Sequence, residues 1–299
     1  MKAMKLFDGR SMAFVIEGMA LRMLAFSGKK IESWYSVPLE GKSVSEGVVA
    51  SPDIVGGMMA EAITEHGLPR RGVVCALPSL GSATQTLTMP DVKKGGLADM
   101  VKREIRRTMP SSQDVDFVHW EELPAQGILR QKRIYTLAVP RSTVLGMAGA
   151  CTTAGVALKG MELKPFALLR AVKCEEGIIV HCEVDSIEVV VVSGGFPALF
   201  RAIPVKDPSP TPEMANQNLL RELPFTIDYY NRSNYESQLS PEAPVYMCGE
   251  LALDPQLAMG ITAAIGREAV GVEPMIECPP NFPVAQFLTC VGLMLREKW

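Results

Sequence analysis

Two well-separated parts of the chain open with the same pattern, and this repetition constrains the fold more than any other feature. In the first part, the apolar runs Ala13–Ile16 and Leu21–Phe26 flank a polar turn, with Arg22 the charged residue inside the second run. In the second part, Ile178–Val180 and Ile187–Val192 flank another polar turn. Short apolar runs separated by turn residues predict β-hairpins. The sequence therefore predicts two halves that begin alike.

Each opening is followed by segments of mixed helical and extended character. Residues 55–63 carry apolar side chains at helical spacing, and residues 78–140 alternate in the order strand, helix, strand, strand. The second pattern predicts a small inserted α+β unit. In the second half an amphipathic segment at 213–235 precedes a final helix at 283–297. This order favours two similar domains that face a cleft over one doubly wound sheet.

Composition excludes some classes of function. The 299 residues are 47% hydrophobic and carry a formal net charge of −3. That hydrophobic content suffices for one large core or two fused ones. Because the net charge gives no field that would gather polyanions, we expect no nucleic acid among the partners.

The sequence also indicates the cellular compartment of the protein. Residues 1–10 lead into no apolar segment typical of a signal peptide, and no apolar stretch reaches the roughly 20 residues that a membrane-spanning helix needs. The seven cysteines are scattered without a C-x-x-C pair, which favours reduced thiols. We expect a cytoplasmic protein whose membrane contact is only peripheral.

Several short sequence segments, spread along nearly the whole chain, form an ordered set. They are Val73–Pro78, Leu87–Pro110 with Glu104 inside it, Tyr135–Pro140, Thr153–Val156, Phe166–Ala171, Arg201–Pro204 and Val291–Arg296. This ordered set resembles the PilM family of type IV pilus assembly proteins, a branch of the actin superfamily related to FtsA. No single segment is diagnostic, and the resemblance depends on their order.

The resemblance implies a fold and domain boundaries. The fold would be the α/β, two-domain actin-like (ribonuclease H-like) ATPase fold with the inserted α+β subdomain of PilM and FtsA. Domain I would span residues 1–172, with the inserted subdomain at 72–140. Domain II would span residues 173–299, with a small subdomain at about 205–243 and a C-terminal helix at 283–297.

The resemblance also implies a role. The protein would be a cytoplasmic platform, recruited to the inner face of the cytoplasmic membrane, that binds the cytoplasmic N-terminal tail of a PilN-like single-pass membrane protein and other pilus assembly components. The tail would lie between the first subdomain and the insertion. The residues expected to form its wall are Leu77, Pro78, Leu80, Met100, Glu104 and Arg107.

Basic residues concentrate in the expected insertion. They are Lys93, Lys94, Lys102, Arg103, Arg106, Arg107, Arg130, Lys132 and Arg133. Such a group either faces anionic lipid or an acidic partner, or is a solvated helix face. We hypothesise that the inserted subdomain lies towards the membrane.

The turns expected to hold ATP depart from the family pattern. An actin-like site needs two glycine-containing turns, each introduced by an aspartate, so that backbone N–H groups can approach the phosphates. A carboxylate about 4 Å from a phosphate costs on the order of 4 kcal/mol per unit-charge pair. We therefore expect no cofactor and no ATP hydrolysis. The residues of these vestigial nucleotide loops are Val15, Glu17, Gly18, His181, Glu183, Asp185, Gly249 and Glu250.

Other chemistry has little support. His181, Glu183 and Asp185 recur at period two and could imitate a metal site, but no nearby spacing supplies a fourth ligand. A solvated turn explains them better, and we expect no metal. None of His66, His119 and His181 lies in a nucleophile motif, so no catalytic residue is predicted.

Two alternatives stay open from the sequence. An active actin-like ATPase could hold ATP with Mg in a shifted pose and drive closure of the cleft. The fold could also polymerise through head-to-tail contacts, as a cytoskeletal protein does.

Overall fold

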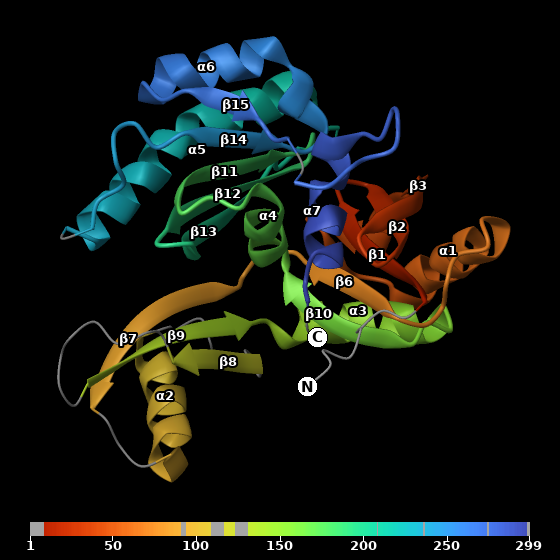
Figure 1. Cartoon of the computed structure of the whole chain (residues 1–299), viewed down its shortest axis with the longest axis horizontal. Coiled ribbons are helices and arrows are strands. Elements are labelled where there is room, and N and C mark those ends of the chain that lie inside the picture. Colours follow the sequence, from red (N-terminus) through yellow and green to blue (C-terminus); the bar gives the residue numbers. More distant parts are fainter. Residues whose placement is uncertain are drawn as a thin grey trace. The chain divides into compact units, whose positions relative to one another are not determined.

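The computed structural model describes residues 9–90, 94–108, 117–122, 131–207, 209–235, 237–273 and 275–297. The chain divides into two compact units (Figure 1). The main unit consists of Met1–Leu80 and Gly146–Trp299, and the inserted unit consists of Gly81–Leu145.

The first half of the main unit is built on a five-stranded sheet in the order β10-β6-β1-β2-β3. Its strands are β1 (Arg10–Glu17), β2 (Ala20–Ser27), β3 (Lys30–Pro38), β6 (Val73–Leu77) and β10 (Leu158–Leu163). The first three strands form an antiparallel meander, whereas β6 runs parallel to β1 and β10 runs parallel to β6. Strands β1 and β2 are buried along almost their whole length, as strands covered on both faces are.

The second half repeats this topology in a sheet of order β13-β12-β11-β14-β15. Its strands are β11 (Glu176–Cys182), β12 (Ser186–Ser193), β13 (Phe196–Pro204), β14 (Val245–Cys248) and β15 (Ala269–Gly271). Again three strands form a meander, and two further strands add in parallel on the side of the first one. The prediction of two halves that open alike is confirmed.

The remaining short elements and helices lie between the strands or, for α7, after the last one. They are η1 (Gly41–Ser43), β4 (Val44–Ser45), β5 (Val48–Val49), α1 (Pro52–Glu65), α3 (Arg141–Thr153), α4 (Lys164–Val172), α5 (Pro212–Ser233), η3 (Glu250–Leu253), α6 (Pro255–Ile265) and α7 (Val284–Met294). None of the helices in the described ranges is both long and apolar enough to cross a membrane.

Helices α4 and α7 lie between the two sheets (Figure 1). Helix α4 contacts strands of both sheets, and α7 packs on β1, β2 and β6 as well as on β14. The two helices cross closely, since a Cβ atom added at Gly292 would lie 1.9 Å from the backbone oxygen of Ala167. Any residue larger than glycine at this position would push the helices apart.

The inserted unit has its own small core. It contains β7 (Ala83–Pro90), α2 (Lys94–Thr108), β8 (Phe117–Glu122) and β9 (Gln131–Val139), with the antiparallel order β7-β9-β8. Leu97, Val101 and Ile105 of α2 are buried together with Leu87 and Ile134 of the sheet. Amphipathic spacing on the helix and alternation on β7 produce this packing.

Several expected boundaries differ from the structure. The inserted unit spans residues 81–145 instead of 72–140, and it begins later because β6 is an inner strand of the first sheet, paired with both β1 and β10. The halves expected as separate domains at 1–172 and 173–299 belong to one compact unit. Residues 205–243 form no separate compact unit among those described. Their main element, α5, buries Ala215, Leu219 and Leu223 in the same core as the second sheet.

Candidate functional site

The hairpin turns that open the two halves face each other in contact. Glu17 ends β1, and Gly18 follows it with a φ of +58°, a conformation that favours glycine. Glu183 comes directly after β11, and Asp185 lies in the turn before β12. A Cβ atom added at Gly18 would lie 3.5 Å from Asp185 Oδ1 and 3.6 Å from Glu183 Oε2. The turn of one half thus packs against acidic side chains of the other.

Arg22 of β2 connects these turns through its guanidinium group. Its Nη1 donates to Glu17 Oε2 at 2.7 Å and to Glu183 Oε1 at 2.8 Å, and its Nη2 donates to Glu183 Oε2 at 2.6 Å. Nη1 also lies 3.0 Å from the backbone oxygen of Gln286 in α7, to which it donates. Only 4% of the Arg22 side chain is exposed, and Glu17 and Glu183 are fully buried beside it. One cation therefore pairs with carboxylates from both halves of the main unit.

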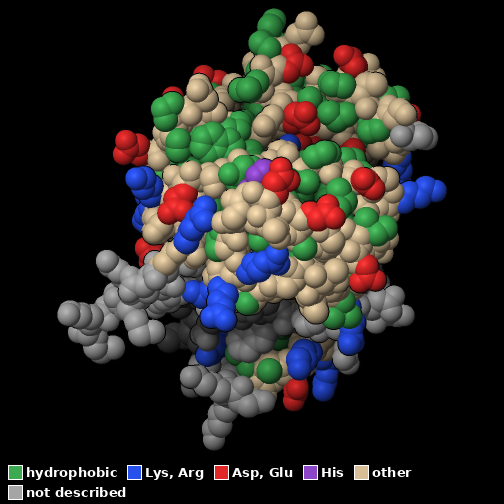
Figure 2. Space-filling view, turned by 90° about the vertical axis from the view of Figure 1, so that its right-hand side faces the viewer, with side chains coloured by type: hydrophobic (Ala, Val, Ile, Leu, Met, Phe, Trp, Pro, Cys, Tyr) green, Lys and Arg blue, Asp and Glu red, His purple; other side chains and the backbone are tan. Residues whose placement is uncertain are grey.

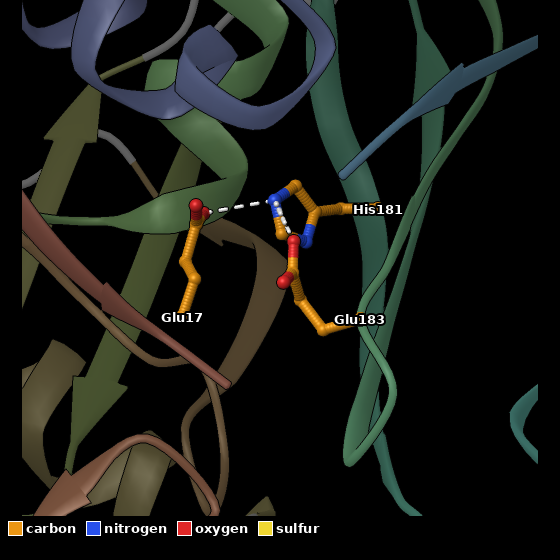
Figure 3. Close-up of side chains that lie close together, drawn as sticks. All are labelled: Glu17, His181 and Glu183. Atoms are coloured by element: carbon orange, nitrogen blue, oxygen red, sulfur yellow. Dashed lines mark ion pairs between the residues drawn. The ribbon is translucent and has the colours of Figure 1, made fainter. Parts of the chain in front are cut away.

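His181 of β11 completes the buried cluster (Figure 3). Its Nε2 atom lies 2.9 Å from Glu17 Oε1 and 3.6 Å from Glu183 Oε1. Neither ring nitrogen forms a hydrogen bond among the described residues, so the ring contacts the carboxylates through proximity alone. The imidazole is completely buried next to the two carboxylates.

Neighbouring groups fix both carboxylates. The hydroxyl of Thr289 in α7 donates to Glu17 Oε1 at 2.6 Å, and the backbone N–H of Glu250 donates to Glu183 Oε1 at 3.0 Å. A second buried ion pair lies nearby, with Lys164 Nζ of α4 3.4 Å from Glu188 Oε2 of β12. Buried charges are stable only when paired and hydrogen-bonded in this way.

The ion pairs keep these groups charged despite their burial. Burial by itself raises the pKa of Glu17, but the imidazole of His181 and the guanidinium of Arg22 outweigh it and hold that pKa far below its ordinary value. Burial likewise opposes the charge of Arg22, yet Glu17 and Glu183 raise its pKa. The pKa of Lys164 is also raised against its burial, chiefly by Glu188 and then by Glu17. Glu17, Arg22 and Lys164 are therefore charged at neutral pH.

A metal ion does not fit this cluster well. Glu17, His181 and Glu183 each offer a ligand atom, and these atoms lie within 4.8 Å of one another. However, Arg22 already donates to both carboxylates, and a divalent cation there would face the guanidinium charge. Asp185, expected to share the face, lies outside the cluster and accepts a hydrogen bond from Ser186 Oγ at 2.9 Å.

The loop that follows β14 packs on the second hairpin. Gly249 has a φ of +93°, and a Cβ atom there would lie 2.5 Å from the oxygen and 2.8 Å from the nitrogen of Cys182. The Gly249 N–H donates at 2.8 Å to the backbone oxygen of Ala285. Ala285 lies in the first turn of α7, next to Gln286. Glycine is required here for the close approach of two backbones. Val15, the remaining loop residue, is buried in β1 opposite Arg22.

Sequence reasoning singled out Glu17, His181 and Glu183 but missed their partner. The interpretation of residues 181–185 as a solvated turn is wrong, because His181 and Glu183 are almost completely buried. Arg22 was noticed only as an interruption of an apolar strand. The signal was available, since an arginine inside a buried strand must find carboxylates to pair with.

The six residues expected to hold a partner peptide fall in both units. Leu77 and Pro78 are buried and Leu80 is half-buried, all three in the main unit. In the inserted unit, Met100 packs against the small core, and Glu104 forms an ion pair with exposed Arg107 on α2. Leu77 and Pro78 therefore present no surface to a ligand.

Part of the basic group can also be placed. Lys102 and Arg103 of α2 are exposed, whereas Lys132 and Arg133 of β9 are half-buried. Residues 93 and 130, and the side chains of residues 94 and 106, lie outside the described part of the chain.

Comparisons with known proteins place the fold. No family model and no curated protein matches the sequence. The solved structure of the PilM–PilN type IV pilus biogenesis complex matches with a TM-score of 0.76 and 20% sequence identity, covering 96% of this chain and 98% of that chain. The cytoplasmic domain of EpsL, an inner membrane component of the type II secretion system of Vibrio cholerae, matches with a TM-score of 0.54 and 12% identity, covering 96% of this chain and 94% of that domain.

A Bacteroides thetaiotaomicron protein of unknown function with an actin-like ATPase fold matches with a TM-score of 0.52 and 9% identity over 96% of both chains. The chain is therefore a protein of the actin-like ATPase fold, and the fold prediction is confirmed. Within that class it is similar to the PilM–PilN structure over almost its whole length, inserted unit included.

Proposed function

We propose that this chain is a platform protein of a type IV pilus machine, which holds the cytoplasmic N-terminal tail of a PilN-like membrane protein and needs no nucleotide to do so. The likeness to the PilM–PilN complex over 96% of the chain supports the pilus role. The likeness to a cytoplasmic domain of a secretion system's inner membrane component supports a place at the inner face of the cytoplasmic membrane.

The single observation that carries the nucleotide-free part is the position of Arg22. It lies between the two turns that hold phosphates in an actin-like ATPase and pairs there with Glu17 and Glu183. A triphosphate would have to displace the guanidinium and would then face two buried carboxylates. That exchange is electrostatically unfavourable, so we infer that ATP binding and hydrolysis have been lost.

Binding of an extended or helical peptide requires no catalysis. Backbone hydrogen bonds and a few apolar pockets give such complexes modest affinity. The protein would stay in the cytoplasm and reach the membrane through its partner and through peripheral contact.

Isothermal titration of the purified full chain tests both parts of the proposal. One titration uses Mg-ATP, and the other uses the cytoplasmic N-terminal peptide of a PilN-like protein from the same organism, with a scrambled peptide as control. We expect micromolar binding of the native peptide only. Micromolar binding of Mg-ATP would restore the ATPase alternative, and equal heats from the native and scrambled peptides would exclude the platform role.

The accessible candidate residues can be tested separately. Leu80→Asp and Arg107→Glu are expected to weaken peptide binding at least about tenfold if each side chain touches the peptide, as loss of a central contact does. Arg103→Glu is the matched control for Arg107, because both arginines are exposed on α2. If Arg103→Glu and Arg107→Glu weaken binding equally, only overall charge matters, and Arg107 is no specific contact.

A further inference from the structure

We propose that Arg22, Glu17 and Glu183 form a permanent clamp that holds the two halves of the main unit closed on each other. In this proposal the guanidinium group takes the place of a ligand between the two turns. The inference deepens the nucleotide-free part of the proposed function and does not depend on the identity of the pilus partner.

The connectivity of Arg22 supports the clamp. Arg22 belongs to the first sheet, and its two hydrogen bonds to Glu183 reach a residue 161 positions away at the opening of the second half. The same guanidinium holds Glu17 of its own hairpin and the backbone oxygen of Gln286 in α7. Opening the halves would break a bidentate pair, which is among the strongest hydrogen-bonded contacts in proteins.

The groups around the clamp oppose opening as well. Glu17 is also held by Thr289 of α7, and Glu183 is held by the backbone of Glu250. The Lys164–Glu188 pair joins α4 to the second sheet a short way off. Each of these charged groups is at least nine-tenths buried, so separation would require water to enter a packed interface.

The consequence concerns conformational change. Cleft closure in response to a ligand needs an open state that the ligand disfavours. In this chain the side chain of Arg22 already pairs with both carboxylates in the closed state. A nucleotide would therefore have no open state to shift towards closure. The two turns should therefore be protected from solvent at all times.

Hydrogen exchange measured by mass spectrometry on the full chain tests the clamp. The segments to follow are residues 17–20 and 183–187, in the presence and absence of Mg-ATP. We expect slow exchange in both segments that Mg-ATP leaves unchanged. Arg22→Lys keeps the charge but loses the bidentate geometry, and we expect it to speed exchange in both segments together by at least about tenfold, while the centres of β1 and β12 stay protected.

Two further variants make the result decisive. Glu183→Gln weakens the same clamp from the second half and should speed exchange in the same two segments. Arg170→Lys is the matched control, because Arg170 donates to Glu162 at 2.6 Å and 2.9 Å in another arginine–glutamate pair of the main unit. We expect Arg170→Lys to leave the hydrogen-exchange rates of both turns at their wild-type values.

The outcomes separate the two proposals. If the turns of Arg22→Lys and Glu183→Gln exchange as slowly as those of the wild type, the clamp proposal is wrong. The proposed pilus role is unaffected by that result. Extra protection of the turns by Mg-ATP in the wild-type chain would overturn both the clamp and the loss of nucleotide binding. Failure to bind the PilN-like peptide, with turns protected as expected, would overturn the pilus role and leave the clamp standing.

Discussion

Arg22 shows how one buried residue can join two distant parts of a chain. A buried arginine is stable only with its carboxylates in place, and here those carboxylates come from the turns of both halves. The single guanidinium charge is shared between two carboxylates, one from each half. In our proposal, the three loop substitutions correspond to one exchange of a ligand for the side chain of Arg22.

Replacement of Arg22 alone should be costly. Arg22→Met leaves two buried carboxylates without their counter-ion, and we expect a loss of about 3–5 kcal/mol in the free energy of unfolding. Urea denaturation measures it. The triple variant Arg22→Met, Glu17→Gln, Glu183→Gln removes the stranded charges and should recover much of the loss.

A surface arginine provides the comparison. Arg201 pairs with Glu222 at 2.8 Å, but 46% of its side chain is exposed. Arg201→Met should cost less than about 1 kcal/mol, as exposed pairs do. Equal losses from Arg22→Met and Arg201→Met would show that the buried cluster contributes little to stability.

The depressed pKa of Glu17 predicts an acid-sensitive fold. Because this pKa lies below the ordinary value of 4.5 in the folded chain, its contribution to stability is complete above about pH 4.5. It is lost as pH falls towards the folded-state pKa, with a slope of up to about 1.4 kcal/mol per pH unit for one proton.

Urea denaturation between pH 3 and pH 6 measures this slope. Glu17→Gln is expected to be less stable than the wild type at pH 6 and to lose stability less steeply below pH 4.5. Parallel pH profiles for the wild type and the variant would contradict the assignment.

At the scale of helices, the crossing of α4 and α7 sets how tightly the space between the sheets is filled. A Cβ atom at Gly292 would overlap the Ala167 oxygen, and backbone atoms cannot move aside as a flexible side chain can. We therefore expect Gly292→Ala to destabilise the chain by about 2 kcal/mol or more in thermal or urea denaturation.

Gly57 gives the matched control. It lies inside α1, and a Cβ atom there would meet nothing within 4 Å. Alanine is the better helix former, so Gly57→Ala should stabilise by about 0.5–1 kcal/mol. A Gly292→Ala chain as stable as Gly57→Ala would mean that the helices can separate without cost.

The strands of the main unit could be predicted from the sequence because their signal is local. Apolar runs such as Ala13–Ile16 and Ile187–Val192 lie inside β1 and β12. Domain boundaries are harder to predict where a strand pairs with another strand that is distant in sequence. Strand β6 looks like part of the insertion in the sequence, but it pairs with β1 in the structure. The clamp is the extreme case, since no local pattern shows that Arg22 meets a carboxylate 161 residues away.

At the scale of the whole molecule, the two compact units differ in where their charged residues lie. The main unit carries the buried ionic cluster and the duplicated sheets, and the inserted unit carries exposed basic residues on α2 around a core of its own. A unit with its own core can present a surface without disturbing the clamp. Membrane contact is therefore best tested on α2.

Charge reversal on α2 should weaken contact with anionic vesicles. Lys102 and Arg103 are exposed, and each basic residue near an anionic surface contributes about 1 kcal/mol. Lys102→Glu with Arg103→Glu is expected to reduce sedimentation with phosphatidylserine vesicles at least about tenfold at low salt, an effect that should shrink as salt screens the charges.

The matched control reverses Lys29 and Lys30, two exposed lysines at the turn between β2 and β3 of the main unit. If the membrane face belongs to α2, this second pair should change binding much less. Equal losses from the two double variants would indicate attraction by overall charge alone. Unchanged binding in the α2 variant would exclude this helix as the membrane face, and any recruitment to the membrane would then have to come from the partner protein.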